Sequence, residues 1–111
     1  MKITFDKKEI ELYAETIAER FRRDALGEGD YEYEITIEEK NPIKLLVTIY
    51  AAYGNRVEIR HNINGIHETE SYCELSSITI KDIEVWICEL SITDITNADE
   101  LEMAINRKVI A

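Results

Sequence analysis

The chain is poor in the residues that break, bend or staple a fold. Its 111 residues include one proline, four glycines and two cysteines. This composition excludes collagen-like, low-complexity and disulfide-framework proteins. The apolar fraction of 45% and the charged fraction of 32% are those of a globular protein. Because a chain of this length buries roughly two-thirds of its unfolded surface, we predict a single domain over residues 1–111.

Long hydrophobic runs are absent as well. No stretch approaches the roughly 20 apolar residues that cross a bilayer, and residues 1–9 carry charges where a secretory signal has a continuous apolar core. We therefore expect a cytoplasmic protein that does not bind membranes. In that compartment Cys73 and Cys88 are expected to be reduced, packed thiols and not a disulfide.

Basic residues are scarce relative to acidic ones. The chain has 13 lysines and arginines against 23 aspartates and glutamates, which gives a net charge of −10. Direct binding to nucleic acid is disfavoured, because it needs basic side chains that displace counterions from phosphates. The charge instead attracts a protein with a basic surface, faster at low salt than at high salt, or serves only to keep the chain in solution. Composition leaves these two roles open.

Helical periodicity is present near both ends of the chain. Asp6 and Glu9 match a capping box, so a long helix should begin at Lys7 and end before Gly27. Apolar residues then recur at helical spacing and form a stripe that can dock on a sheet: Ile10, Tyr13, Ala14, Ile17, Ala18, Phe21 and Ala25. Asn97 is a candidate N-cap for a short second helix with an apolar face of its own.

The middle of the chain has the pattern of strands: residues 31–38 alternate apolar and polar side chains, while in residues 44–53 apolar side chains occupy both faces, as in a central strand. The predicted strands cover residues 31–38, 44–53, 56–63, 67–75 and 78–90, with a bulge or turn at 81–82. Asn41-Pro42, Gly54-Asn55 and Asn64-Gly65 are the turn signals between them. Residues 83–90 also fit a helical face, and this alternative stays open. The element order predicts an α+β two-layer sandwich: an antiparallel sheet of about five strands, a long N-terminal helix and a short C-terminal helix.

Asn64-Gly65 is the strongest turn signal, and charge suggests its register. A two-residue turn would place Glu70 opposite Ile59, on a face that is expected to be buried. A turn lengthened by Ile66 pairs Glu70 with Arg60 instead. Opposite charges across a strand pair contribute roughly 0.2–1 kcal/mol, and a slip by one residue turns every side chain over. We therefore predict the three-residue turn.

Recognised catalytic and metal motifs are missing. The sequence has no nucleophile elbow, phosphate-binding loop or calcium loop. His61, His67, Glu68 and Glu70 gather near one hairpin end, but their spacing matches no zinc motif. We predict no enzyme, no cofactor and no metal, while a metal on the two histidines stays an open alternative.

The arrangement of the acidic residues is the most informative pattern. Two rows of glutamates occur, one at helical spacing on the first helix and one on the exposed face of the first long strand: Glu11, Glu15 and Glu19, then Glu32, Glu34 and Glu38. Like charges four residues apart on a helix are unfavourable by a few tenths of a kcal/mol, which suggests a use for the row. Alternate residues of a strand lie about 7 Å apart, about twice the 3.4 Å rise per phosphate of one DNA strand.

These rows lead to a prediction of a non-catalytic acidic module that binds a partner protein and occludes its basic, nucleic-acid-binding surface. In size, charge and coarse architecture the chain resembles the phage-encoded inhibitors that mimic nucleic acid, anti-CRISPR proteins among them. The first alternative is an assembly module that self-associates through a sheet edge or through tyrosines: Tyr31, Tyr33, Tyr50, Tyr53 and Tyr72. The second is a small enzyme or ligand-binder with a pocket between helix and sheet.

Overall fold

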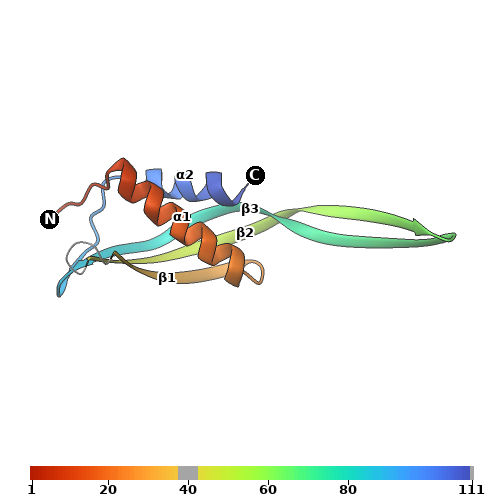
Figure 1. The fold of residues 1–111 in the computed structure, drawn as a ribbon, viewed down its shortest axis with the longest axis horizontal. Coiled ribbons are helices and arrows are strands. Elements are labelled where there is room, and N and C mark those ends of the chain that lie inside the picture. Colours follow the sequence, from red (N-terminus) through yellow and green to blue (C-terminus); the bar gives the residue numbers. More distant parts are fainter. Residues whose placement is uncertain (38–42, 111) are drawn as a thin grey trace.

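The structure, a computed structural model, describes residues 1–37 and 43–110. In chain order the elements are α1 (Lys7–Asp24), β1 (Gly29–Ile37), β2 (Ile43–Ile63), β3 (Ile66–Ile87), β4 (Leu90–Ile92) and α2 (Ala98–Val109). The four strands form one antiparallel sheet in the order β1-β2-β3-β4, and both helices lie on the same face of it (Figure 1). The predicted α+β fold, with an antiparallel sheet between a long N-terminal and a short C-terminal helix, is confirmed.

The start of α1 follows from its capping box. The Asp6 carboxylate accepts a hydrogen bond from the Glu9 N–H at 2.8 Å, and the Glu9 carboxylate accepts one from the Asp6 N–H at 3.1 Å. The helix begins at Lys7, as predicted, and its C-cap is Ala25. None of the described helices is long and apolar enough to cross a membrane.

The core lies between α1 and the sheet. The buried side of α1 is the predicted stripe from Ile10 to Phe21, and it packs with the inward residues of the strands. Ile17 from the helix and Leu45 and Ile49 from β2 are fully buried. In the described residues, side chains from the helix and from the sheet fill this layer.

Two asparagines attach α2 to the rest of the fold. Asn97, which precedes the helix and is buried, makes no capping bond to it. Its side chain instead accepts from the Phe5 N–H at 2.9 Å and donates to the Phe5 carbonyl at 2.8 Å. Asn106 does the same with the N–H and carbonyl of Ile78 on β3, at 2.9 and 2.8 Å. Each amide thereby satisfies both backbone groups of one residue, and at Ile78 it takes the place of a neighbouring strand.

Several predicted strands join into two long ones. The predicted turn at Gly54-Asn55 is wrong, because β2 continues through it and accommodates one extra residue as a bulge. On β3 the register skips Ser76 and Lys81 in the same way, which places a bulge where one was expected at 81–82. Residues 83–87 are strand and not helix, and a turn at Cys88-Glu89 leads into β4. The turn signal at Asn41-Pro42 lies outside the described residues.

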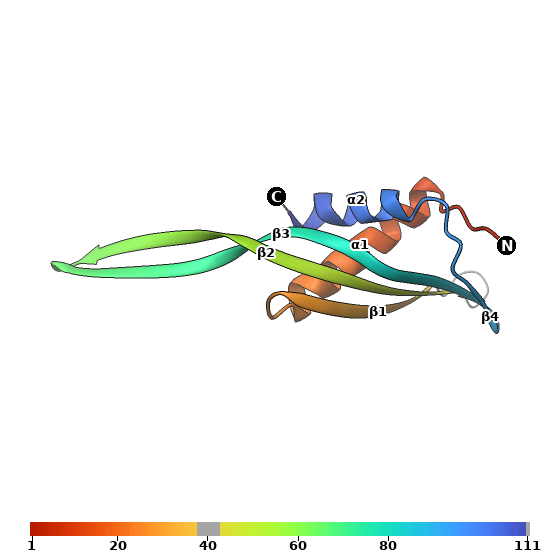
Figure 2. The ribbon, with the colours of Figure 1, turned by 180° about the vertical axis from the view of Figure 1, so that it is seen from behind.

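The two long strands extend well past the rest of the molecule (Figures 1 and 2). We call residues 53–75, from β2, the turn and β3, the arm, and the remaining described residues the body. The arm is a two-stranded ribbon that no helix covers, and it makes the molecule 65 Å long against 23 and 22 Å in the other two directions. None of the residues 56–74 whose exposure is described is buried.

The predicted register of the arm is wrong. Ile63 pairs with Ile66 across a two-residue turn, in which Asn64 and Gly65 have φ angles of 54° and 81°. Glu70 therefore lies opposite Ile59, the pairing that we had rejected. The rejection assumed that one face of the hairpin is buried. Because both faces of the arm meet water, a carboxylate beside Ile59 carries no desolvation cost.

Candidate functional site

The two predicted rows of glutamates lie on opposite sides of the body. Glu32 and Glu34 are exposed on the sheet face that carries no helix, while their neighbours Tyr33 and Ile35 face the helices and are buried. Glu38 lies outside the described residues. The helix row is exposed on the outer side of α1, beyond the helical layer: Glu11, Glu15 and Glu19. The full thickness of the body separates the two rows, so a single flat partner surface cannot meet both.

The helix row is also partly neutralised. Glu11 forms a short ion pair with Lys108 of α2, and this pair bridges the two helices. The row therefore has an internal structural role at one end, and its remaining members are separate surface charges. We therefore place the candidate functional site on the other side of the body.

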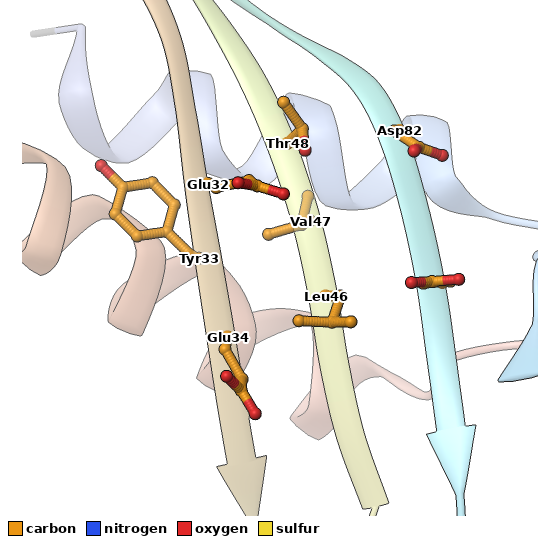
Figure 3. A pocket seen from close by; sticks show the side chains of 8 residues that line it. Glu32, Tyr33, Glu34, Leu46, Val47, Thr48 and Asp82 are labelled. Carbon is orange, nitrogen blue, oxygen red and sulfur yellow. The ribbon is translucent and has the colours of Figure 1, made fainter. Parts of the chain in front are cut away.

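The helix-free face contains two acidic residues that the sequence prediction did not include. Asp82 of β3 lies on the same face as the two glutamates of β1, with β2 between them (Figure 3). Glu84 of β3 lines the same depression. The register pairs Glu32 and Asp82 with Thr48, and it pairs Glu34 and Glu84 with Leu46. We call the four carboxylates Glu32, Glu34, Asp82 and Glu84 the acidic face. They line a depression of about 320 Å³ whose floor is β2.

The acidic face is only partly compensated by cations. Lys44 forms an ion pair with Glu34 at 2.6 Å, and the Glu84 carboxylate accepts a hydrogen bond from Ser91 at 2.9 Å. Among the described residues, Glu32 and Asp82 form no ion pair. The part of the face around Thr48, which Glu32 and Asp82 flank, therefore has the most negative electrostatic potential. Carboxylates held apart on rigid strands attract cationic side chains and repel phosphates.

A signal for Asp82 and Glu84 was present in the sequence. The segment 82–87 alternates acidic or aromatic residues with Ile83, Val85 and Ile87, which is the pattern of a strand with one buried face. Its reading as a strand was open because the same residues also fit a helical face. Even with the strand assigned, the bulge at Lys81 decides which face Asp82 occupies, and no sequence rule located that bulge to one residue.

The polar residues of the arm do not assemble into a site. His61 shares a ribbon face with Glu68 and Glu70, whereas His67 pairs with Asn62 on the other face. No cluster of three or more potential metal ligands occurs within residues 1–37 and 43–110. Cys73 and Cys88 are both free and exposed, so the expectation of packed thiols is wrong. Cys73 lies on the uncovered arm and Cys88 in the turn before β4, where nothing packs over them.

The tyrosines likewise do not form one patch. Tyr31 packs edge-on against Phe21 of α1, with ring centroids 5.3 Å apart, and Tyr33 is buried beside it. Tyr50 is on the helix-free face, where the Lys81 ammonium lies 5.9 Å from its ring centroid, and Tyr72 is on the arm. The described positions of these four tyrosines are thus divided among the core, the helix-free face and the arm.

The pKa values of two buried tyrosines, Tyr13 and Tyr33, are raised. Burial, with a smaller contribution from Glu9, raises the pKa of Tyr13 to about 12. Burial, followed by the Asp24 carboxylate, also raises the pKa of Tyr33 to about 12. Neither hydroxyl has a hydrogen-bond partner within the described part of the chain. Tyr13 is on the buried side of α1, and Tyr33 is a buried residue of β1, so both phenols are part of the core and neither is one of the four carboxylates of the acidic face.

Comparison with known proteins gives no relative. No family model matches the sequence, and neither the curated proteins nor the solved structures include a significant match.

Proposed function

We propose that this protein is a non-catalytic binding module whose acidic face docks on a basic, nucleic-acid-binding surface of a larger protein and occludes it. The observation that supports this proposal is the grouping of four carboxylates on the one sheet face that the protein leaves uncovered. The same proposal places the protein in the cytoplasm, where nucleic-acid-binding machinery is accessible to it.

The spacing of these carboxylates suits a groove that binds phosphates. Alternate residues on one strand lie about 7 Å apart, and strands two apart lie about 10 Å apart. The acidic face is therefore a pair of carboxylate columns, one on β1 and one on β3, with Leu46 and Thr48 between them. Two negative columns flanking a partly apolar strip offer a basic groove both ion pairs and a surface to desolvate.

The net charge of −10 adds a long-range component. Attraction between a strongly acidic protein and a basic groove accelerates association, and added salt screens it over about 10 Å at 0.1 M. We therefore expect capture of basic proteins from a cell lysate at low salt, loss of the complex at high salt, and its displacement by added DNA or RNA. Displacement is the decisive result, because it requires the partner to use one surface for both ligands.

Matched charge reversals test which face is responsible. One variant carries Glu32→Lys, Asp82→Lys and Glu84→Lys on the acidic face, and the control carries Glu11→Lys, Glu15→Lys and Glu19→Lys on α1. Both variants change the net charge by the same amount. We expect the acidic-face variant to lose at least about tenfold in affinity and the helix variant to lose much less. Equal losses would mean that only net charge matters, and unchanged binding by the acidic-face variant would refute the proposal.

A further inference from the structure

In the body, helix side chains bond backbone groups at several positions along the edges of the sheet. On β3, Asn106 of α2 bonds the N–H and carbonyl of Ile78, and the Glu102 carboxylate accepts from the Ile80 N–H at 2.6 Å. On β1, Arg20 of α1 donates to the Glu34 carbonyl at 2.6 Å. Such covers prevent another strand from adding to the sheet.

The outer edge of β2 in the arm has no such cover. Pairing with β1 ends at Gly29 and Ala51, and the Glu28 carboxylate accepts the next outward N–H, that of Tyr53, at 3.1 Å. Beyond it, no described strand pairs with this edge. The arm contains neither lysine nor proline, two residues that often block an exposed edge, although Arg56, Glu58 and Arg60 lie along it.

The register identifies which backbone groups this edge presents. Ile63 and Ile66 flank a two-residue turn and therefore exchange both of their backbone hydrogen bonds. Because the direction of these bonds alternates along a strand, the N–H and carbonyl groups of Ile59 also point toward β3. Those of the even-numbered residues from 56 to 62 point outward, to the free edge.

We propose that this edge pairs with the same edge of a second copy of the chain, antiparallel and with Ile59 opposite Ile59. In this register the outward groups of Glu58 face those of Arg60 in the second copy, and the hydrogen-bonding pattern is satisfied on both sides of the two-fold axis. The result is a four-stranded ribbon in the order β3-β2-β2-β3, with the two bodies at opposite ends.

Charge supports this edge and this register. The Glu58 and Arg60 side chains become directly opposite across the new pair, once on each side of the axis, which is the favourable cross-strand arrangement. The outer edge of β3 offers no equivalent, because its arm segment carries three glutamates and no lysine or arginine: Glu68, Glu70 and Glu74. Two copies joined there would bring like charges together.

The length of the free edge also places the two-fold axis of the proposed pairing at Ile59. Ile59 is the midpoint of residues 55–63, and with Ile59 paired to itself, Ile63 of the second copy lies opposite position 55. The tip of the second arm therefore ends just before Tyr53, where Glu28 closes the edge. Leu26, in the same loop as Glu28, is 99% exposed.

Pairing also accounts for the uncovered apolar face of the arm. Five apolar side chains share one face of the ribbon with His61, Glu68 and Glu70, while the other face is polar: Val57, Ile59, Ile63, Ile66 and Tyr72. A two-stranded hairpin is marginally stable in water, and three or more strands with an apolar face are needed for independent stability. The second copy supplies two more strands and doubles that face.

A register-specific cross-link tests the pairing directly. In a chain with Cys73→Ser and Cys88→Ser, we expect Ile59→Cys to form an interchain disulfide on mild oxidation, because residue 59 faces itself across a non-hydrogen-bonded pair. The matched control is Asn62→Cys, a neighbouring exposed arm position that faces position 56 and not itself. A dimer from Ile59→Cys alone supports the proposal. Equal cross-linking of both variants, or of neither, overturns it.

A charge swap tests the same register without cysteines. Sedimentation of the unmodified chain over a concentration series should show a weak dimer, because edge pairing buries little area. Arg60→Glu should weaken it about tenfold, and adding Glu58→Arg should restore it. Circular dichroism of each variant checks that the fold is retained. A monomer at every concentration, or a dimer insensitive to Arg60→Glu, would overturn the proposal.

Discussion

The strands β2 and β3 run through both the body and the arm, but their surroundings differ in the two regions. In the body, β2 lies between β1 and β3 beneath α1, and Ile49 is fully buried. Ten residues further along the same strand, Ile59 of the arm is 39% exposed. In both segments apolar residues share one face of the strand: Leu45, Val47 and Ile49 in the body, and Val57, Ile59 and Ile63 in the arm. Alternation therefore shows which side chains share a face, while burial depends on whether another element covers that face.

The comparison is tested most strongly by the same substitution in both regions. Ile49→Ala should lower the free energy of unfolding by about 3 kcal/mol, because it opens a cavity in a filled core. Ile59→Ala should change it by less than about 0.5 kcal/mol, because the side chain packs against little in a single chain. Urea denaturation at low protein concentration measures both. Similar losses in the two variants would show that the arm shares the packing of the body.

Asparagines provide the second comparison. Asn106→Ala removes the amide that pairs with the backbone of Ile78 and leaves two backbone groups unsatisfied beneath α2, so we expect a loss of about 2 kcal/mol. Asn62→Ala, on the exposed arm, should alter stability by only a few tenths of a kcal/mol. Thermal unfolding of the two variants distinguishes them. If Asn106→Ala left the stability unchanged, water would satisfy the backbone N–H and carbonyl of Ile78 as well as the amide does.

Tyrosine hydroxyls provide the third comparison. Tyr13→Phe should stabilise the protein by about 1 kcal/mol, since the hydroxyl is buried without a partner among the described residues, whereas Tyr72→Phe on the arm should be neutral.

Tyr13 also predicts a loss of stability at alkaline pH. Its pKa is raised to about 12 in the fold from 10.0, so the neutral phenol stabilises the native state below pH 10 and this contribution is lost as pH rises toward 12. At pH 11 the loss is about 1 kcal/mol, and Tyr13→Phe should remove it. Unfolding midpoints measured from pH 9 to 12 test the sign; a parallel decline in both proteins would contradict it.

The smallest global effect is expected at the arm turn. Gly65 has a φ of 81°, so Gly65→Ala strains the turn by about 1 kcal/mol. We expect faster amide hydrogen exchange along the arm and a global unfolding midpoint that stays nearly constant, because the arm can open without the body. A global loss equal to the local one would show that arm and body unfold together.

Three local signals in the sequence were reliable, whereas the turn signal at Gly54-Asn55 was not. The capping box placed the first residue of α1, the apolar stripe identified its buried side, and Asn64-Gly65 located the arm turn. These features depend on residues close in the chain, whose interactions do not need the rest of the fold. The acidic pair on β1 was found for the same reason, because alternation along one strand assigns its exposed face.

The register of the arm, the merging of strands at Gly54 and the addition of Asp82 and Glu84 to the acidic face were not predictable in this way. Each depends on bulges and on which faces are covered, and a bulge changes the facing of every residue beyond it.

The sequence by itself therefore determined the α+β class, the ends of the helices and the face on which each strand residue lies relative to its neighbours. Only the tertiary structure decided that β2 and β3 continue past the body as an uncovered arm. It also separated the two glutamate rows onto opposite sides of the molecule and left the outer edge of β2 open. The physical reason is that periodicity records the alternation of side chains along one segment, while cover and edges depend on which distant segments pack beside it.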